Sequence, residues 1–230
     1  MKKSTVLVAA LLSVAAFSSA QAQGVRLGLR AGANYSNLSG NIKNENTYNN
    51  KLGFVGGVML NAPIVENFFS IQPELLYSQK GFENKPTEYT NILGYQTKRE
   101  GKVNYNYLDL PILAKINADG FYFEAGPQIS YLLSSNNQTK TTTTSPLTGE
   151  PETSQAENQN DVSELNRTEL GYAAGLGYQA ENGLSIGLRY TGAFSDLVKS
   201  DNGDTYFNGD LKNARHSAFQ VSLGYLIGNK

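Results

Sequence analysis

The chain has 230 residues, a net charge of −1, no cysteine, no tryptophan and one histidine. The lack of cysteine excludes disulfides and thiolate metal sites. A near-neutral charge without a basic cluster gives no case for nucleic acid binding.

The N-terminal segment has the three parts of an export signal. Lys2 and Lys3 carry positive charge, residues 6–17 form an apolar core, and Ala20-Gln21-Ala22 is a small-residue cleavage pattern. The core is too short to cross a bilayer as a helix. We therefore expect two parts: a signal peptide, 1–22, and a mature domain, 23–230.

After the signal, apolar and polar residues alternate in eight segments. Successive side chains of a strand point to opposite faces, so a period of two predicts amphipathic strands. The predicted strands are 25–36, 52–61, 69–80, 107–116, 121–133, 170–179, 184–191 and 219–227.

The pattern is clearest in the central hairpin, 107–133. Its apolar faces consist of Leu108, Leu110, Ile112, Ala114 and Ile116, then Phe121, Phe123, Ala125, Ile129, Tyr131 and Leu133. Asp119-Gly120 between the arms supplies the positive φ that a tight hairpin turn needs. Each arm reaches the roughly nine to eleven residues of a transmembrane strand.

The connections alternate in length. Those after the second, fourth and sixth strands are short, whereas long polar connections occupy 38–50, 81–101, 135–167 and 195–213. We expect residues 135–167 to be mobile because they offer little apolar surface to bury. The fold predicted is an all-β, eight-stranded antiparallel up-and-down transmembrane barrel with short periplasmic turns and long extracellular loops.

The polar faces of these strands would then line the lumen. They carry Arg26, Arg30, Glu74, Asp109, Lys115, Glu124 and Arg189, together with Gln72, Gln128 and Gln220. Side chains just fill an eight-stranded barrel, and buried charges need partners. We therefore expect a structural, charge-paired network rather than a wide pore or carboxylates for acid–base catalysis.

Other signals are weaker. Gly175 and Gly177 fit a dinucleotide fingerprint, but no helix follows them. The segment 201–204 (Asp-Asn-Gly-Asp) suits a loop turn as well as it suits a calcium-binding site. His216, the only possible histidine base, is expected at the rim beside the last loop. We expect no catalytic residue, metal or cofactor.

Prolines and aromatic residues add two expectations. Pro73, Pro111 and Pro127 fall inside strands, where we expect local bulges. Aromatic girdles would follow the two membrane interfaces, although strand propensity also enriches aromatics. The girdle candidates are Tyr35, Tyr77, Tyr107, Tyr131 and Tyr190 near the long loops, and Phe69, Phe121, Tyr178 and Tyr225 near the short turns.

Four motifs carry a family resemblance: FFSIQPELLYSQKG at 68–81, YLDLP at 107–111, FEAGPQ at 123–128 and GLGY at 175–178. With these motifs the mature chain resembles the PorT-like outer-membrane β-barrel proteins of Bacteroidetes-type bacteria. The resemblance implies an eight-stranded outer-membrane barrel, generally without a known activity. Its namesake is tied to protein secretion and gliding, a role that these motifs do not carry over. Many such barrels end on an aromatic residue, whereas this chain runs past Tyr225 to Lys230.

The sequence thus predicts an integral outer-membrane barrel of a Gram-negative cell envelope, structural or surface-interacting and not an enzyme. Expected partners are outer membrane lipid, the barrel insertion machinery, and an extracellular or envelope protein reached through the long loops. One alternative is a soluble lipocalin-like lipid-binding barrel, which would invert the two faces. The other, an outer-membrane enzyme, would need a nucleophile–histidine pair.

Overall fold

The structure, a computed structural model, describes residues 24–42, 48–155, 162–199 and 211–227. The predicted signal peptide and the possible calcium segment lie outside these ranges. Within them the strands are β1 (Arg26–Asn41), β2 (Tyr48–Val65), β3 (Phe69–Thr90), β4 (Gln96–Ala118), β5 (Phe121–Asn137), β6 (Lys140–Thr144), β7 (Pro151–Gln155), β8 (Thr168–Gln179), β9 (Leu184–Ala193) and β10 (Asn213–Leu226). None of the described residues belongs to a helix long and apolar enough to span a membrane.

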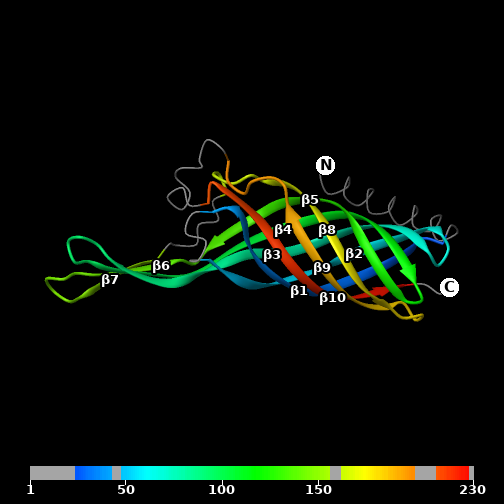
Figure 1. Cartoon of the computed structure of the whole chain (residues 1–230), viewed down its shortest axis with the longest axis horizontal. Helices are drawn as coiled ribbons and strands as arrows, with labels where there is room; N and C mark the ends of the chain where they lie inside the picture. Colours follow the sequence, from blue (N-terminus) through cyan, green and yellow to red (C-terminus); the bar gives the residue numbers. More distant parts are fainter. Residues whose placement is uncertain (1–23, 43–47, 156–161, 200–210, 228–230) are drawn as a thin grey trace, which may run out of the picture.

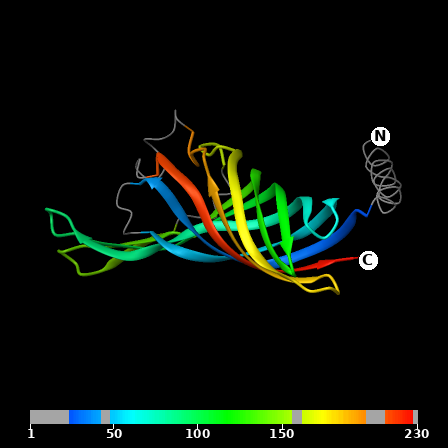
Figure 2. The same cartoon turned by 45° about the vertical axis from the view of Figure 1, so that its right-hand side comes forward.

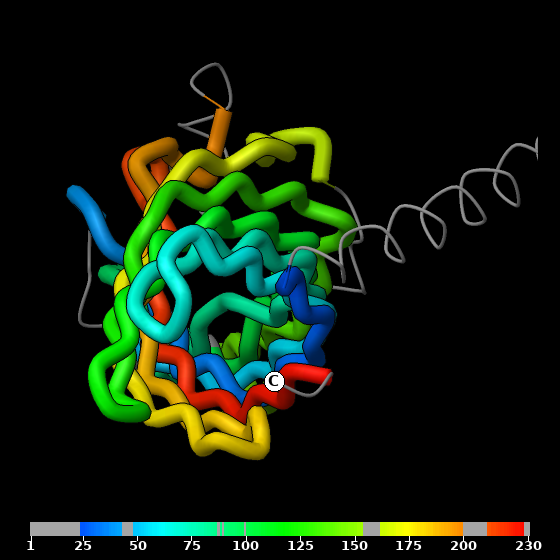
Figure 3. Tube along the Cα trace, turned by 90° about the vertical axis from the view of Figure 1, so that its right-hand side faces the viewer, coloured from blue at the N-terminus to red at the C-terminus, as the bar shows by residue number. Residues whose placement is uncertain are grey.

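Eight strands close into a ring. The order is β1-β2-β3-β4-β5-β8-β9-β10, and β10 pairs with β1 again. Every neighbour is antiparallel, and Figures 1 and 3 show the elongated barrel from the side and from one end. The predicted eight-stranded up-and-down barrel is therefore confirmed.

The two faces of the barrel wall have opposite chemistry. The exposed face is apolar along the strands, for example Leu110 and Ile112 on β4, Phe123 on β5 and Leu223 on β10. Their neighbours in sequence are buried, and many are polar or charged. A soluble lipid-binding barrel requires the reverse arrangement, so the faces disfavour that alternative.

The short turns lie together at one end of the barrel. They join β2 to β3, β4 to β5, and β8 to β9. In the central hairpin the positive φ falls on Asp119 (50°) and Gly120 (87°), as the Asp-Gly pair predicted. We call this end the short-turn rim, and the opposite end the long-loop rim.

At the long-loop rim the prediction of loops is wrong in two places. Strands β3 and β4 continue through most of 81–101, with a turn only at residues 91–95. The segment 135–167, predicted to be mobile, contains the end of β5 and the hairpin of β6 and β7, which adds to the edge of β4. The result is a four-stranded extension that protrudes from the barrel (Figures 1 and 2).

A hydrophobic core closes the barrel near the long-loop rim. Barrel residues such as Phe82, Val103 and Tyr105 belong to one buried cluster with Leu165 and Leu197 from the loops. A bridge joins Leu165 to Val198, and the Asn166 amide donates to two carbonyls of residues 196 and 198. The connections predicted as polar loops therefore supply a cap; of 195–213, residues 200–210 lie outside the described ranges. We call this core the apolar cap.

The prolines do not produce the expected bulges. The register is unchanged on both sides of Pro73, Pro111 and Pro127, but the ladder skips two residue pairs beside each of them. A proline lacks the N–H that the ladder needs, so its effect is a local gap in pairing. At one gap Gly126 lets the backbones approach, because a Cβ there would lie 1.9 Å from the Ile112 carbonyl oxygen.

Candidate functional site

Four charged side chains from four strands meet inside the barrel. Arg189 of β9 binds Glu74 of β3 at 2.8 Å and Glu124 of β5 at 2.6 Å. Arg30 of β1 lies 3.1 Å from Glu74 and 3.6 Å from Glu124. None of the four side chains is more than 2% exposed. We call this set the central network.

Strand geometry explains why these residues meet. Each occupies an inward position of its strand, so the ring directs all four side chains to the axis. Two guanidiniums and two carboxylates give zero net charge, and each carboxylate faces both cations. Arg189 donates charge-assisted hydrogen bonds to both carboxylates, whereas Arg30 Nε and Glu124 Oε2 have no hydrogen-bond partner among the described residues. The arrangement braces opposite walls of the barrel and occupies its lumen.

A second charged cluster lies between the central network and the apolar cap. The Lys80 ammonium is 3.2 Å from Asp109 and 3.4 Å from Glu169, and His216 Nδ1 is 2.8 Å from Glu169. The expectation that His216 is a rim residue is wrong, since the side chain is 2% exposed and its ring packs edge-on against Tyr107. Tyr107, predicted for a girdle, is likewise fully buried.

Three members of this second cluster were missing from the predicted lumen set: His216, which was expected at the rim, Lys80 and Glu169. Lys80 already stood on the polar face of its strand, so the alternation could have included it. Glu169 precedes the predicted start of its strand at residue 170, whereas β8 begins at Thr168. Glu169 could be recognised only if the start of this strand were known, and the polar sequence before residue 170 hides that start.

The remaining predicted cations lie apart from both clusters. The Lys115 ammonium donates to Gln179 Oε1 at 2.7 Å and lies 4.0 Å from the centre of the Tyr122 ring. Arg26 is partly buried near the short-turn rim. Of the seven predicted charges, four therefore form the central network, Asp109 joins Lys80, and Lys115 and Arg26 belong to neither.

The predicted glutamines are all buried and act as hydrogen-bond donors in the lumen. The Gln72 amide donates to Glu74 at 2.7 Å and so supports the central network. The Gln128 amide donates to Ser130, and that of Gln220 donates to Asn34. Polar packing thus continues between the two charged clusters and around them.

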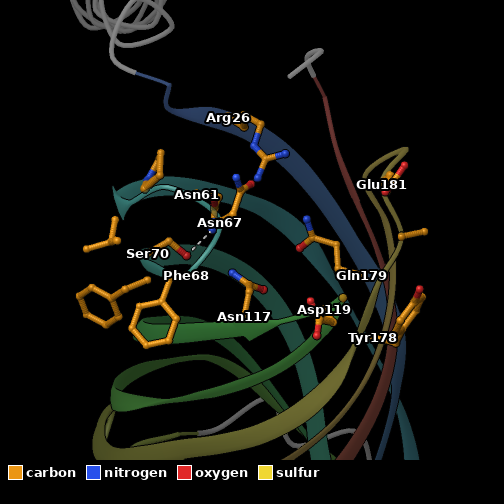
Figure 4. A pocket seen from close by; sticks show the side chains of 15 residues that line it. Arg26, Asn61, Asn67, Phe68, Ser70, Asn117, Asp119, Tyr178, Gln179 and Glu181 are labelled. Atoms are coloured by element: carbon orange, nitrogen blue, oxygen red, sulfur yellow. Dashed lines mark hydrogen bonds between the residues drawn. The ribbon is translucent and has the colours of Figure 1, made fainter.

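A cavity of about 430 Å³ opens at the short-turn rim. Figure 4 shows Arg26 on β1, Asn61 on β2, Gln179 at the end of β8 and Glu181 in the turn that follows it around the cavity. The Asn61 amide donates to Ser70 at 2.8 Å in its wall. Its polar, amide-rich lining suits water and small polar solutes at the mouth of the lumen.

The histidine has the wrong surroundings for a hydrolase. Its Nδ1 faces the Glu169 carboxylate and the Tyr107 hydroxyl, beneath the apolar cap. Among the described residues this side chain is almost fully buried, so its ring is not exposed to a substrate. In the part of the chain that the structure describes, no three His, Asp or Glu residues form a group that could hold a metal ion.

Solved membrane barrels are similar to this chain at low sequence identity. Neisserial surface protein A is 10% identical with a TM-score of 0.44, and the alignment covers 86% of this chain and 96% of that protein. Ail, the attachment invasion locus protein of Yersinia pestis, is 12% identical with a TM-score of 0.40, covering 88% of this chain and 98% of Ail. No curated protein matches the sequence.

A family model, described as the outer membrane protein beta-barrel domain, matches residues 19–199. This match covers most of the chain, including the strands that supply the central network. The protein therefore belongs to the outer membrane protein beta-barrel domain family, and is an outer-membrane β-barrel protein.

Proposed function

We propose that the protein is a closed outer-membrane barrel that acts through its structure and surface rather than as a wide pore or an enzyme. The observation that carries this proposal is the central network, in which Arg30 and Arg189 bridge Glu74 and Glu124 across the lumen. A continuous aqueous channel would have to break these buried pairs, at a cost of several kcal/mol.

The apolar cap supports the same function. It blocks the lumen on the long-loop side of the central network, since Leu165 and Leu197 from the loops share one buried cluster with the barrel residues Phe82 and Tyr105. A solute that entered the cavity at the short-turn rim would meet the charged network first and the cap second. Two successive barriers, one charged and one apolar, suit a barrel that does not conduct solutes.

The orientation follows from the asymmetry of the two rims. Outer-membrane barrels have short periplasmic turns and longer extracellular loops. We assign the short-turn rim to the periplasm and the protruding extension to the cell exterior, after export through the signal peptide 1–22. The finer resemblance to the PorT-like family, through motifs such as YLDLP at 107–111, fits this role without assigning a secretion function.

The partners of such a protein are lipid, the barrel insertion machinery, and an extracellular or envelope molecule that contacts the extension. Activity as an enzyme is disfavoured because the histidine is buried between Glu169 and two tyrosines. We assign no nucleic acid, metal or cofactor to this function.

Cell fractionation combined with a heat-modifiability gel tests this proposal. Detergent should be needed to extract the folded protein, and its gel mobility should change on boiling. Protease added to intact cells should cut within 140–155 and leave the barrel as a protected fragment. Recovery of folded protein in the soluble periplasm, or cleavage only after the cells are opened, would contradict the location or the orientation.

A further inference from the structure

The protruding extension ends in two neighbouring hairpin turns. One turn joins β3 to β4 and the other joins β6 to β7 (Figures 1 and 2). They are close enough that a Cβ on Gly94 would lie 3.2 Å from the Pro146 side chain. We call Ile92, Leu93, Pro146 and Leu147 the hairpin tip.

The hairpin tip displays large aliphatic side chains to solvent. Ile92 is 103% exposed, Leu147 is 89% exposed and Leu93 is 70% exposed. The lipid-facing Leu110 on the barrel is only 40% exposed, because its neighbours along the wall cover part of it. Side chains of the hairpin tip therefore stand clear of the fold, at the end farthest from the membrane that holds the barrel.

Ordered turns produce this exposure. The Asn91 side-chain oxygen accepts hydrogen bonds from the Leu93 and Tyr95 amides at 2.9 and 3.0 Å. In the second turn, the Ser145 hydroxyl accepts from the Leu147 amide at 3.3 Å, and the Ser145 carbonyl accepts from the Gly149 amide at 2.9 Å. Polar side chains thus fix both turns and leave the aliphatic groups outward.

The sequence around the hairpin tip is free of charge. Residues 89–97 and 141–149 contain no Asp, Glu, Lys or Arg, although the segments are flanked by Glu88, Lys98, Lys140 and Glu150. A solvated hairpin end gains solubility from charged residues and loses it from exposed aliphatic ones. The composition instead suits an apolar environment. There a charged side chain would cost free energy, and an aliphatic side chain gains free energy because it leaves water.

Lipid fits this surface better than a protein. A stable protein interface buries about 800 Å² on each partner around a fitted pocket, whereas the hairpin tip offers a few side chains on a convex end. Apolar side chains can enter lipid independently, without a matching surface. We propose that the hairpin tip inserts into the lipid of a membrane other than the one that holds the barrel; this rests on the extracellular orientation proposed above.

Tryptophan fluorescence can test insertion at a single position, because the chain contains no native tryptophan. The variant Leu93→Trp is placed in nanodiscs of ordinary phosphatidylcholine and mixed with protein-free vesicles of brominated phosphatidylcholine. Insertion predicts a blue-shifted emission and at least twofold quenching. The control Lys102→Trp, on β4 and nearer the barrel than the turn that carries Leu93, should remain unquenched. Equal quenching at both positions, or none at residue 93, would overturn the proposal.

Vesicle flotation supplies a second measurement on the native side chains. The wild-type protein in nanodiscs should float with protein-free phosphatidylcholine vesicles, and the combined variant Ile92→Ser, Leu93→Ser and Leu147→Ser should float at least tenfold less. The matched control Ile64→Ser removes a similarly exposed side chain at the short-turn rim and should float normally. Equal flotation of the triple variant, or no flotation of the wild type, refutes lipid insertion.

The same preparations separate this proposal from the one on which it rests. A heat-modifiability gel of each nanodisc sample reports whether the barrel is folded in lipid. Failure of the wild type to show the folded band would count against the membrane barrel itself. A folded wild-type protein that does not bind the vesicles would contradict lipid insertion of the hairpin tip and leave the membrane barrel unaffected.

Discussion

Glu124 offers the sharpest test of the central network. Its Oε1 accepts from Arg189 Nε at 2.9 Å and from Nη2 at 2.6 Å, and its side chain is 1% exposed. Glu124→Gln keeps the shape and removes the charge, so two guanidiniums remain with Glu74 alone. Removing one partner of a buried ion pair costs about 3–5 kcal/mol. The amide oxygen of glutamine can still accept a hydrogen bond, so we expect about 3 kcal/mol.

A double-mutant cycle identifies the cause of that loss. Arg189→Met in the Glu124→Gln background leaves Arg30 paired with Glu74 and restores neutrality. The two changes should therefore be less than additive by about 2 kcal/mol, within the range found for contacting residues. Urea unfolding in lipid vesicles, followed by circular dichroism and by the heat-modifiable band, gives the free energies.

A surface pair provides the control for this cycle. Glu100 lies 3.1 Å from Lys98, but these side chains are 37% and 42% exposed, so Glu100→Gln should cost less than about 1 kcal/mol. A cost for Glu124→Gln as small as this, or strict additivity with Arg189→Met, would refute the cross-lumen pairing.

Three further predictions address the wall, the cap and the extension. Leu110 faces lipid near the middle of β4, so Leu110→Arg should cost about 2–4 kcal/mol in lipid-vesicle unfolding; a harmless change would mean that this face does not meet lipid. Leu165 is fully buried in the apolar cap, so Leu165→Ala should cost about 2–5 kcal/mol by the same assay, and no loss would show that the cap is not packed. Replacing 140–155, the β6–β7 hairpin, by a short linker should leave the heat-modifiable band intact, since surface loop length changes closure entropy by only about 1 kcal/mol; loss of all folded protein would make this hairpin part of the barrel's stability.

The sequence predicts the membrane-spanning part well because one physical rule governs it. Lipid demands apolar side chains outside, and a narrow lumen accepts polar ones inside. The alternation therefore places Leu110, Asp109, Glu124 and Arg189 on the faces where the structure has them. The tight Asp119-Gly120 turn is equally local, since its backbone conformation depends on two residues.

Beyond the membrane the rule is reversed: apolar side chains face inward and polar ones face outward. In β3 and β4 near the long-loop rim, Phe82, Val103 and Tyr105 point inward into the apolar cap, while the neighbouring Lys102 is exposed to water. The sequence prediction requires apolar residues on the outer face of every strand, so it assigns this stretch to a loop. Strands β3 and β4 consequently reach 22 and 23 residues, well past the predicted boundaries.

The alternation of apolar and polar residues also does not predict which charged side chains contact one another. It places a side chain inside the barrel but leaves its height and partner undetermined, because those depend on strand stagger around the ring. Lys115 is directly opposite Glu124 in the β4–β5 register, yet its ammonium donates to Gln179. Arg189, from a strand that does not pair with β5, binds the Glu124 carboxylate instead.

The most direct test of a sealed lumen is ionic conductance of the purified wild-type protein in planar lipid bilayers, with a general porin as positive control in the same bilayers. The central network and the apolar cap predict insertion without stable open-channel steps across the accessible voltage range. Sustained conductance steps of porin size from the folded, heat-modifiable protein would contradict the closed barrel.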